Sequence, residues 1–213
     1  MPGSRAGELV RRTQIRDAAF ELAANGGLKS VTIRDVADRA GLSPGLVLFH
    51  FGSKEQLILC VLDWVLETTT ALRVEARVST IADPGDRLLA LLRQEMVRLV
   101  SEPLRIRLFF EFWGAGLWDR EIGSRMQREL DRYRDAFRPM AEAVLAEEPE
   151  RFPGVTADSL AAVAVSLIKG CAVQSIIEPD LDLQAFLATS ERLLAPLSTS
   201  NGTKAKGRLP IGR

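Results

Sequence analysis

Hydroxyl residues stand at three expected helix starts within residues 30–54, and a cationic residue follows two of them. Thr32, Ser43 and Ser53 are typical first residues, because their side-chain oxygens accept hydrogen bonds from free backbone N–H groups. Arg34 follows the first of these positions and Lys54 follows the third. A helix start with a neighbouring cation can bind phosphate. These residues therefore indicate non-covalent contact with a phosphate backbone.

The residue types that carry covalent catalysis are scarce. The chain has one histidine, His50, and two cysteines, Cys60 and Cys171, far apart in apolar stretches where buried thiols are expected. This composition leaves no serine or cysteine triad and no zinc site. The carboxylates alternate with arginines at helical spacing, which favours salt bridges over an acid–base pair. We expect no enzyme, no cofactor and no metal.

Residues 30–54 have the pattern of a helix-turn-helix followed by the start of a third helix. Thr32 would begin a short helix with apolar residues at spacings of three and four, and Gly41 would end it in a left-handed conformation. Ser43 and Pro44 would then begin a second helix. In such a motif the second helix enters the major groove of DNA, led by its N-terminal residues.

The expected DNA contacts follow from that docking geometry. They are Thr32, Arg34, Ser43, Pro44, Gly45, Leu46, Phe49, His50 and Lys54. Few of these can bond a base edge in a bidentate manner, so apolar contact, such as Leu46 with a thymine methyl group, would carry much of the readout. Val47 and Phe51 are expected to face inward. His50 either faces DNA or packs on the following helix. Arg5, Arg11 and Arg12 either reach the DNA backbone or face solvent.

Residues 15–59 resemble the N-terminal domain of TetR-type transcriptional regulators. The matching residues are Ala18, Ala19, Gly26, Thr32, Val36, Ala37, Ala40, Gly41, Ser43, Gly45, His50, Phe51, Ser53, Lys54, Glu55 and Leu57. Two residues depart from the common pattern: Leu46 stands where many members have Thr, and Leu48 stands where many have a phosphate-bonding Tyr. Residues 109–137 are similar to the ligand-binding domain of the betaine-regulator branch. The resemblance implies a repressor.

The overall charge is balanced, with 28 Lys/Arg and 28 Asp/Glu, but its distribution is uneven. Residues 1–60 carry a net charge of +2, residues 61–198 of −6, and the remaining C-terminal residues of +4. Because phosphates attract cations and repel carboxylates, the chain would approach DNA with residues 1–60 and not with the acidic residues 61–198. Because one such segment has few cations, two copies would have to act together.

The remaining chain reads as helix, which predicts an all-α fold of about nine helices. We expect a helix-turn-helix domain over residues 1–54, a ligand-binding and dimerisation domain over 55–197, and a disordered basic tail over 198–213. A long helix should run from Ser53 to about Arg77. The helix over 160–177 is apolar nearly all round and must be covered on two sides. Together with the last helix it is the candidate homodimer interface, and the alternative is a monomer core.

Aromatic residues gather in the second domain. Trp64, Phe109, Phe112, Trp113 and Trp118 either form core or line a cavity for a small-molecule effector, and their faces could cage a quaternary ammonium group.

No run approaches about 18 consecutive apolar residues and the N-terminus lacks a secretory apolar segment, so we expect a cytoplasmic protein without membrane contact. The leading hypothesis is a dimeric, effector-responsive regulator that binds a palindromic DNA operator. An all-helical enzyme or an interaction module without DNA binding is the alternative.

Overall fold

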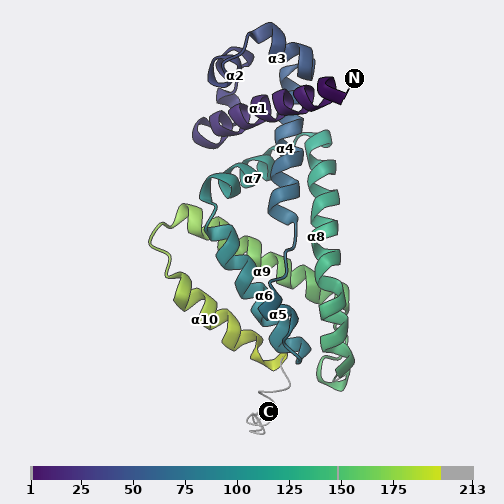
Figure 1. Cartoon of the computed structure of the whole chain (residues 1–213). Helices are drawn as coiled ribbons and strands as arrows, with labels where there is room; N and C mark the ends of the chain where they lie inside the picture. Colours follow the sequence, from purple (N-terminus) through teal and green to yellow (C-terminus); the bar gives the residue numbers. More distant parts are fainter. Residues whose placement is uncertain (1, 148, 198–213) are drawn as a thin grey trace. The chain divides into compact units, whose positions relative to one another are not determined.

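The computed structural model describes residues 2–147 and 149–197, with side chains from residue 7 onward. These residues form ten α-helices and no strand, so the all-α prediction is confirmed (Figure 1). The expected tail over 198–213 lies outside the described residues. The helices are α1 (Pro2–Gly26), α2 (Ile33–Ala40), α3 (Pro44–Phe51), α4 (Lys54–Thr70), α5 (Ala76–Ser79), α6 (Pro84–Val100), α7 (Pro103–Gly116), α8 (Arg120–Glu147), α9 (Ala157–Ile177) and α10 (Leu183–Leu194). Short 3-10 turns occur at Leu28–Ser30, Pro149–Arg151 and Ala195–Leu197.

The helices divide into two compact units, and neither unit is one continuous stretch of chain. Unit 1 consists of Met1–Ala71 and Glu102–Leu130, and unit 2 of Leu72–Ser101 and the chain from Asp131 onward. Unit 1 therefore adds α4, α7 and the first turns of α8 to the three helices that the sequence suggests as a separate domain. Each unit is described by itself below.

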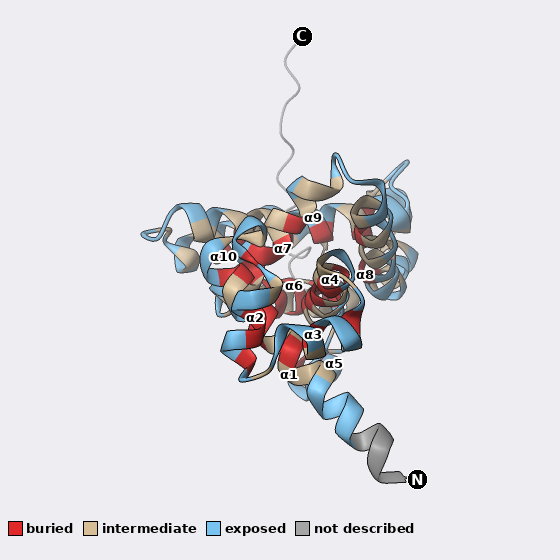
Figure 2. Ribbon diagram, turned by 90° about the horizontal axis from the view of Figure 1, so that it is seen from above, coloured by how far each residue is buried: buried red, intermediate tan, exposed pale blue. Residues whose placement is uncertain are grey.

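Unit 1 has one core, formed where α1, α2, α4 and α7 pack on one another. The buried faces of α1 and α2 carry small residues such as Ala19, Ala23 and Ala37, which allow close approach of the helices (Figure 2). Glu111 of α7 accepts a hydrogen bond from the backbone N–H of Leu28 at 2.7 Å, directly after α1 ends. The turn after α1 is thus held by a side chain from α7.

The helix expected to continue to about Arg77 ends earlier, at Thr70. Ala71 is extended, and an extended stretch leads to the short α5. Two causes favour the break. Three consecutive threonines, 68–70, are poor helix formers, and a side chain of α6 compensates the backbone groups released by the break. Gln94 accepts from the N–H of Glu75 at 3.0 Å and donates to the carbonyl of Arg73 at 2.5 Å.

Unit 2 is built around the contact between α6 and α9. Thr156 begins α9 with a capping box, and eight α9 residues are buried. By length and composition alone α9 could cross a membrane, although no unbroken apolar run of that length exists in the sequence. The core helix of a water-soluble protein passes the same test, so the finding is weak evidence for a membrane span.

A cluster of polar side chains lies inside unit 2. Glu95 is fully buried, pairs with Arg98 at 2.7 Å and accepts a hydrogen bond from the Tyr133 hydroxyl at 2.8 Å. The Lys169 side chain is 4 % exposed, and its ammonium lies 4.8 Å from the centre of the Tyr133 ring. Burial, together with the positive charge of Arg98, lowers the pKa of Lys169 to about 7. Burial and the Glu95 charge raise the pKa of Tyr133.

The lowered pKa of Lys169 makes the stability of the chain depend on pH. The folded pKa of about 7 lies below the ordinary value of 10.5, so between them the folded state binds fewer protons than the unfolded state. The free energy of unfolding should therefore rise by about 1 to 2 kcal/mol from about pH 7 to about pH 8.5. We expect Lys169→Met to remove this rise, measured by urea unfolding at both pH values. The exposed Lys29→Met is the control and should keep the rise. An unchanged pH dependence in Lys169→Met would contradict the assignment.

Candidate nucleic-acid interface

The first helix of the predicted motif has the caps that the sequence indicates. The Thr32 hydroxyl accepts a hydrogen bond from the N–H of Asp35 at 3.1 Å, and the Asp35 carboxylate accepts from that hydroxyl at 2.6 Å. The Asp35 carboxylate therefore bonds the hydroxyl of Thr32, whereas in a standard capping box it would bond the backbone N–H of the capping residue. Gly41 ends α2 with φ 65°, a left-handed conformation that glycine adopts readily. Arg34 is exposed on the first turn of α2.

The second helix, α3, exposes its N-terminal turn. The Ser43 hydroxyl accepts from the N–H of Leu46 at 3.2 Å. Ser43, Pro44 and Gly45 are exposed, and Leu46 is half-buried. Val47 and Phe51 are buried as expected. The start of α3 is therefore accessible to a partner.

Two aromatic rings continue this surface along α3. The Phe49 side chain is 80 % exposed, an unusual position for a phenylalanine in a folded chain. The His50 ring is half-buried and meets Phe49 edge to face at 5.3 Å. Leu48, which directly precedes Phe49, is also exposed. The exposed face of α3 is thus largely apolar.

The third helix start carries the expected cation. The Ser53 hydroxyl accepts from the N–H of Gln56 at 3.2 Å, and Lys54 is half-buried on the first turn of α4. Glu55 beside it is exposed, and hydrogen bonds from its own backbone N–H and from Ser53 lower the pKa of its carboxyl group. A phosphate approaching this helix start meets Lys54 on one side and a stable carboxylate on the other.

Side chains of α1 hold the ends of both motif helices. Gln14 donates to the carbonyl of Ala40, the last residue of α2, at 2.6 Å. Arg12 donates to the carbonyl of His50 near the end of α3, and its guanidinium lies 4.4 Å from the centre of the Phe51 ring. One guanidinium nitrogen of the half-buried Arg12 is thus bound inside unit 1, a structural role that the two alternatives drawn from the sequence, DNA contact or solvent, do not include. Arg11 bonds Gln14, and the side chain of Arg5 lies outside the described residues.

Two family models match the chain. Residues 15–61 match the bacterial regulatory proteins of the tetR family, and residues 84–198 match the C-terminal domain of BetI-type transcriptional repressors. The second match alone covers more than half of the chain.

The chain belongs to the TetR family.

Similar proteins agree with this assignment. The HTH-type transcriptional regulator BetI of Stenotrophomonas maltophilia is 29 % identical over 58 % of the chain, and the chain spans 63 % of the length of that relative. BetI of Rhizobium meliloti is 27 % identical over 97 % of both chains. A solved structure from Saccharomonospora viridis, of a candidate transcriptional regulator in complex with choline, has a TM-score of 0.64 at 21 % identity, covering 86 % of this chain and 95 % of the other. The matched families consist of regulators, not enzymes.

In this TetR-family chain the core alternative describes four of the five aromatic residues, because Phe109 and Phe112 belong to the core of unit 1 and Trp64 and Trp113 pack against it. Phe109 and Phe112 are fully buried in the core of unit 1, and Phe109 meets Trp113 edge to face at 5.7 Å. Trp118 follows the end of α7 and is 92 % exposed, so among the described residues it is placed neither in the core nor in a cavity lining. The hollows found in unit 2 are lined by other residues.

Trp64 cannot serve as an ammonium cage in this arrangement. Its ring is half-buried, with the guanidinium of Arg16 at 4.8 Å and that of Arg105 at 5.1 Å from ring centres. Phe20 packs edge to face on the same indole at 4.9 Å. Two cations already occupy the positions where a quaternary ammonium group would bind, and they would repel it.

We expect Arg12→Met to destabilise unit 1 without acting directly on DNA. The variant keeps the aliphatic stem but leaves the His50 carbonyl without this donor, which should lower the free energy of unfolding by about 1 to 3 kcal/mol. Urea unfolding measures the loss. Arg107→Met removes an exposed arginine of the same unit and should change stability by less than about 0.5 kcal/mol. Unchanged stability with weakened DNA binding in Arg12→Met would show that Arg12 contacts DNA after all.

Proposed function

We propose that the chain is a sequence-specific DNA-binding transcriptional regulator that acts as a homodimer in the cytoplasm. It represses by occupying a palindromic operator and leaves it when a small-molecule effector binds. The observation that carries the proposal is the exposed start of α3, with Ser43, Pro44 and Gly45 accessible while Val47 and Phe51 anchor the helix from behind.

The residues of this surface would make two kinds of contact with DNA, charged contacts with phosphates and apolar contacts with bases. Arg34 and Lys54 supply the cations for phosphate oxygens, and Arg34 has the length to reach a guanine edge. Leu46 and Phe49 supply apolar contact in the major groove, where thymine methyl groups lie. Thr32 and His50 complete the surface at its edges. With few cations for each copy, an operator with two half-sites is needed for useful affinity.

The C-terminal helices support dimerisation. Val163, Ser166, Gly170, Gln174 and Ile177 follow one another at helical spacing on α9, and none of them is buried in this protomer. A Cβ added at Gly170 meets nothing within 4 Å, so packing inside the chain does not require glycine there. On α10 the Leu193 side chain is 75 % exposed. A second copy covering these residues would bury apolar surface and exploit the close approach that glycine allows.

Effector response would follow from the dimer. Two recognition helices must stand about 34 Å apart to enter successive major grooves. An effector that binds better to a conformation with another spacing shifts the population away from DNA. The shift is limited by the difference between its affinities for the two states.

The DNA proposal predicts losses at two named cations. On DNA flanking the protein's own gene, Arg34→Ala should weaken binding about tenfold through a lost base or phosphate contact. Lys54→Ala should weaken it and reduce the slope of log affinity against log salt by about 1. Gel shifts at several salt concentrations measure both effects. Arg107→Ala on α7 removes an equal charge elsewhere in unit 1 and should bind as the wild type does. Wild-type binding by both cation variants would refute the contact assignment.

The dimer proposal predicts a change of mass. Gly170→Arg should convert the dimer into a monomer in sedimentation velocity, because a long cation would enter the packed α9 face, and should lose most operator affinity. The control Val155→Arg places the same side chain at an exposed loop position. A sedimentation coefficient that stays the same in both variants would place the dimer contact elsewhere.

A further inference from the structure

Unit 2 contains a hollow that the proposed DNA surface does not use. It has a volume of about 450 Å³ and lies between the segment 73–81 and one face of α6. This volume falls within the range of sites for small organic molecules. We call it the arginine hollow because Arg73, Arg77, Arg93 and Arg98 line it, with Glu75 as the one carboxylate residue of the lining.

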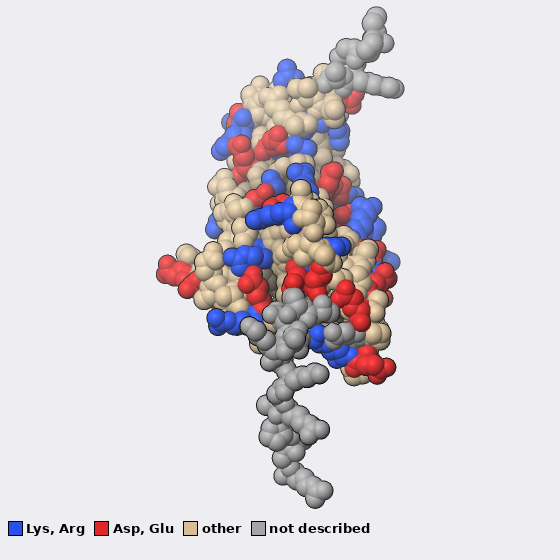
Figure 3. All heavy atoms as spheres, turned by 60° about the horizontal axis from the view of Figure 1, so that its bottom comes forward, with Lys and Arg blue, Asp and Glu red and all other residues tan. Residues whose placement is uncertain are grey.

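The charge of this lining is more one-sided than that of the molecular face described next. Lysines, arginines and carboxylates are interspersed over the face that Figure 3 shows. Another hollow of unit 2, of about 250 Å³, is lined by aspartates and arginines that pair with one another. Four arginines facing one space with a single lining carboxylate favour an anion.

The arginines differ in how firmly they are already paired. Arg98 is held by the buried Glu95 and belongs to the interior cluster. Arg77 bonds Glu75 and Arg93 bonds Glu191, but these carboxylates are 49 % and 43 % exposed. Exposed ion pairs contribute little to stability, so a ligand carboxylate can replace them at small cost. Arg73 is exposed and makes no ion pair among the described residues.

The wall that carries Arg73 is anchored rather than loose. Gln94, only 8 % exposed, bonds the backbone of both Arg73 and Glu75. The remaining lining is aliphatic, with Val78, Ile81, Ala90 and Val97 between the arginines. A lining that combines arginines with aliphatic side chains matches a molecule with a charged head and an apolar body.

We propose that the arginine hollow binds an organic anion with an apolar body, such as a carboxylate or phosphate ester carrying a hydrocarbon chain. As the effector of the regulator, this ligand class rests on the proposed function, whereas binding to the hollow does not. An anionic effector differs from the quaternary ammonium group that the aromatic residues first suggested.

Calorimetric titration of the full chain with decanoate, below its micelle concentration, tests the proposal. Decanoate should bind saturably with one molecule for each chain. Decyltrimethylammonium and 1-decanol carry an alkyl chain one carbon longer than that of decanoate, without the anion, and should bind at least tenfold more weakly. The double variant Arg73→Met, Arg77→Met should lower decanoate affinity at least tenfold, and Arg73→Met alone should give an intermediate loss.

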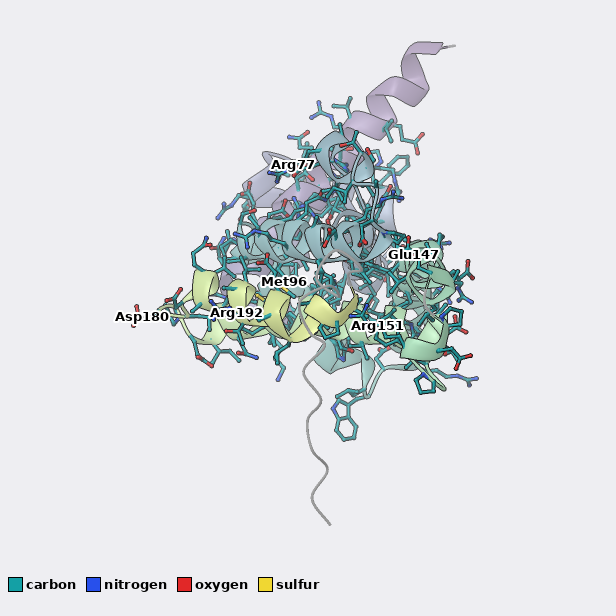
Figure 4. The ribbon with its side chains drawn as sticks, turned by 90° about the horizontal axis from the view of Figure 1, so that it is seen from below. Arg77, Met96, Glu147, Arg151, Asp180 and Arg192 are labelled. Atoms are coloured by element: carbon teal, nitrogen blue, oxygen red, sulfur yellow. The ribbon has the colours of Figure 1, made fainter. Side chains whose placement is uncertain are left out.

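Arg192→Met is the matched control, because Arg192 is an exposed arginine of unit 2 outside the lining. Figure 4 shows it on the yellow α10, well apart from Arg77. Its affinity should stay within twofold of the wild type. Absent decanoate binding, equal binding of decanoate and the two decyl compounds, or wild-type affinity in the double variant would overturn the site. Because DNA is absent from the titration, anion-specific binding supports the site even if the chain proves not to bind an operator.

Discussion

The DNA-reading surface depends on hydrogen bonds to the carbonyl groups at the ends of the two short motif helices, α2 and α3. The last carbonyls of any helix lack partners within the helix. Here α1 supplies donors for them, Gln14 to Ala40 and Arg12 to His50. Helices of eight residues would be marginal by themselves. Side chains from α1 therefore bond carbonyl groups at the ends of both α2 and α3 and tie these short helices to α1.

Unit 2 depends on a different interaction, the burial of charged groups with their partners. Glu95 is fully buried and is satisfied by Arg98 and by the Tyr133 hydroxyl. Removing one member of such a cluster leaves a charge that has lost its solvation, which is costly. Arg98 also lines the arginine hollow, so one side chain belongs both to the interior cluster and to the proposed ligand site. A ligand anion near Arg98 would act on the same charges that hold α6 to α8.

The local sequence predicts those helix ends and buried positions whose determining interaction joins residues only a few positions apart. The capping residues Thr32, Ser43, Ser53 and Thr156, and the glycine that ends α2, are recognisable because each cap joins positions three or four apart. The inward positions of Val47 and Phe51 follow from helical periodicity in the same way. The helix α4 ends earlier than its sequence pattern predicts, because Gln94, the side chain that bonds the backbone of Arg73 and Glu75 after the break, lies 19 to 21 residues away from them.

The sequence by itself determined an all-helical chain, the helix-turn-helix and the face of α3 that is turned outward. These features depend on spacing, on capping chemistry and on the contrast between apolar and polar positions, all of which are local. The tertiary structure decided how the side chains from distant helices are used. It made Arg12 a partner of the α3 backbone, packed Phe109 and Phe112 as core, left Trp118 exposed, and brought Arg73 and Arg77 opposite Arg93. Those outcomes depend on which helices pack together, and no spacing along the chain encodes that.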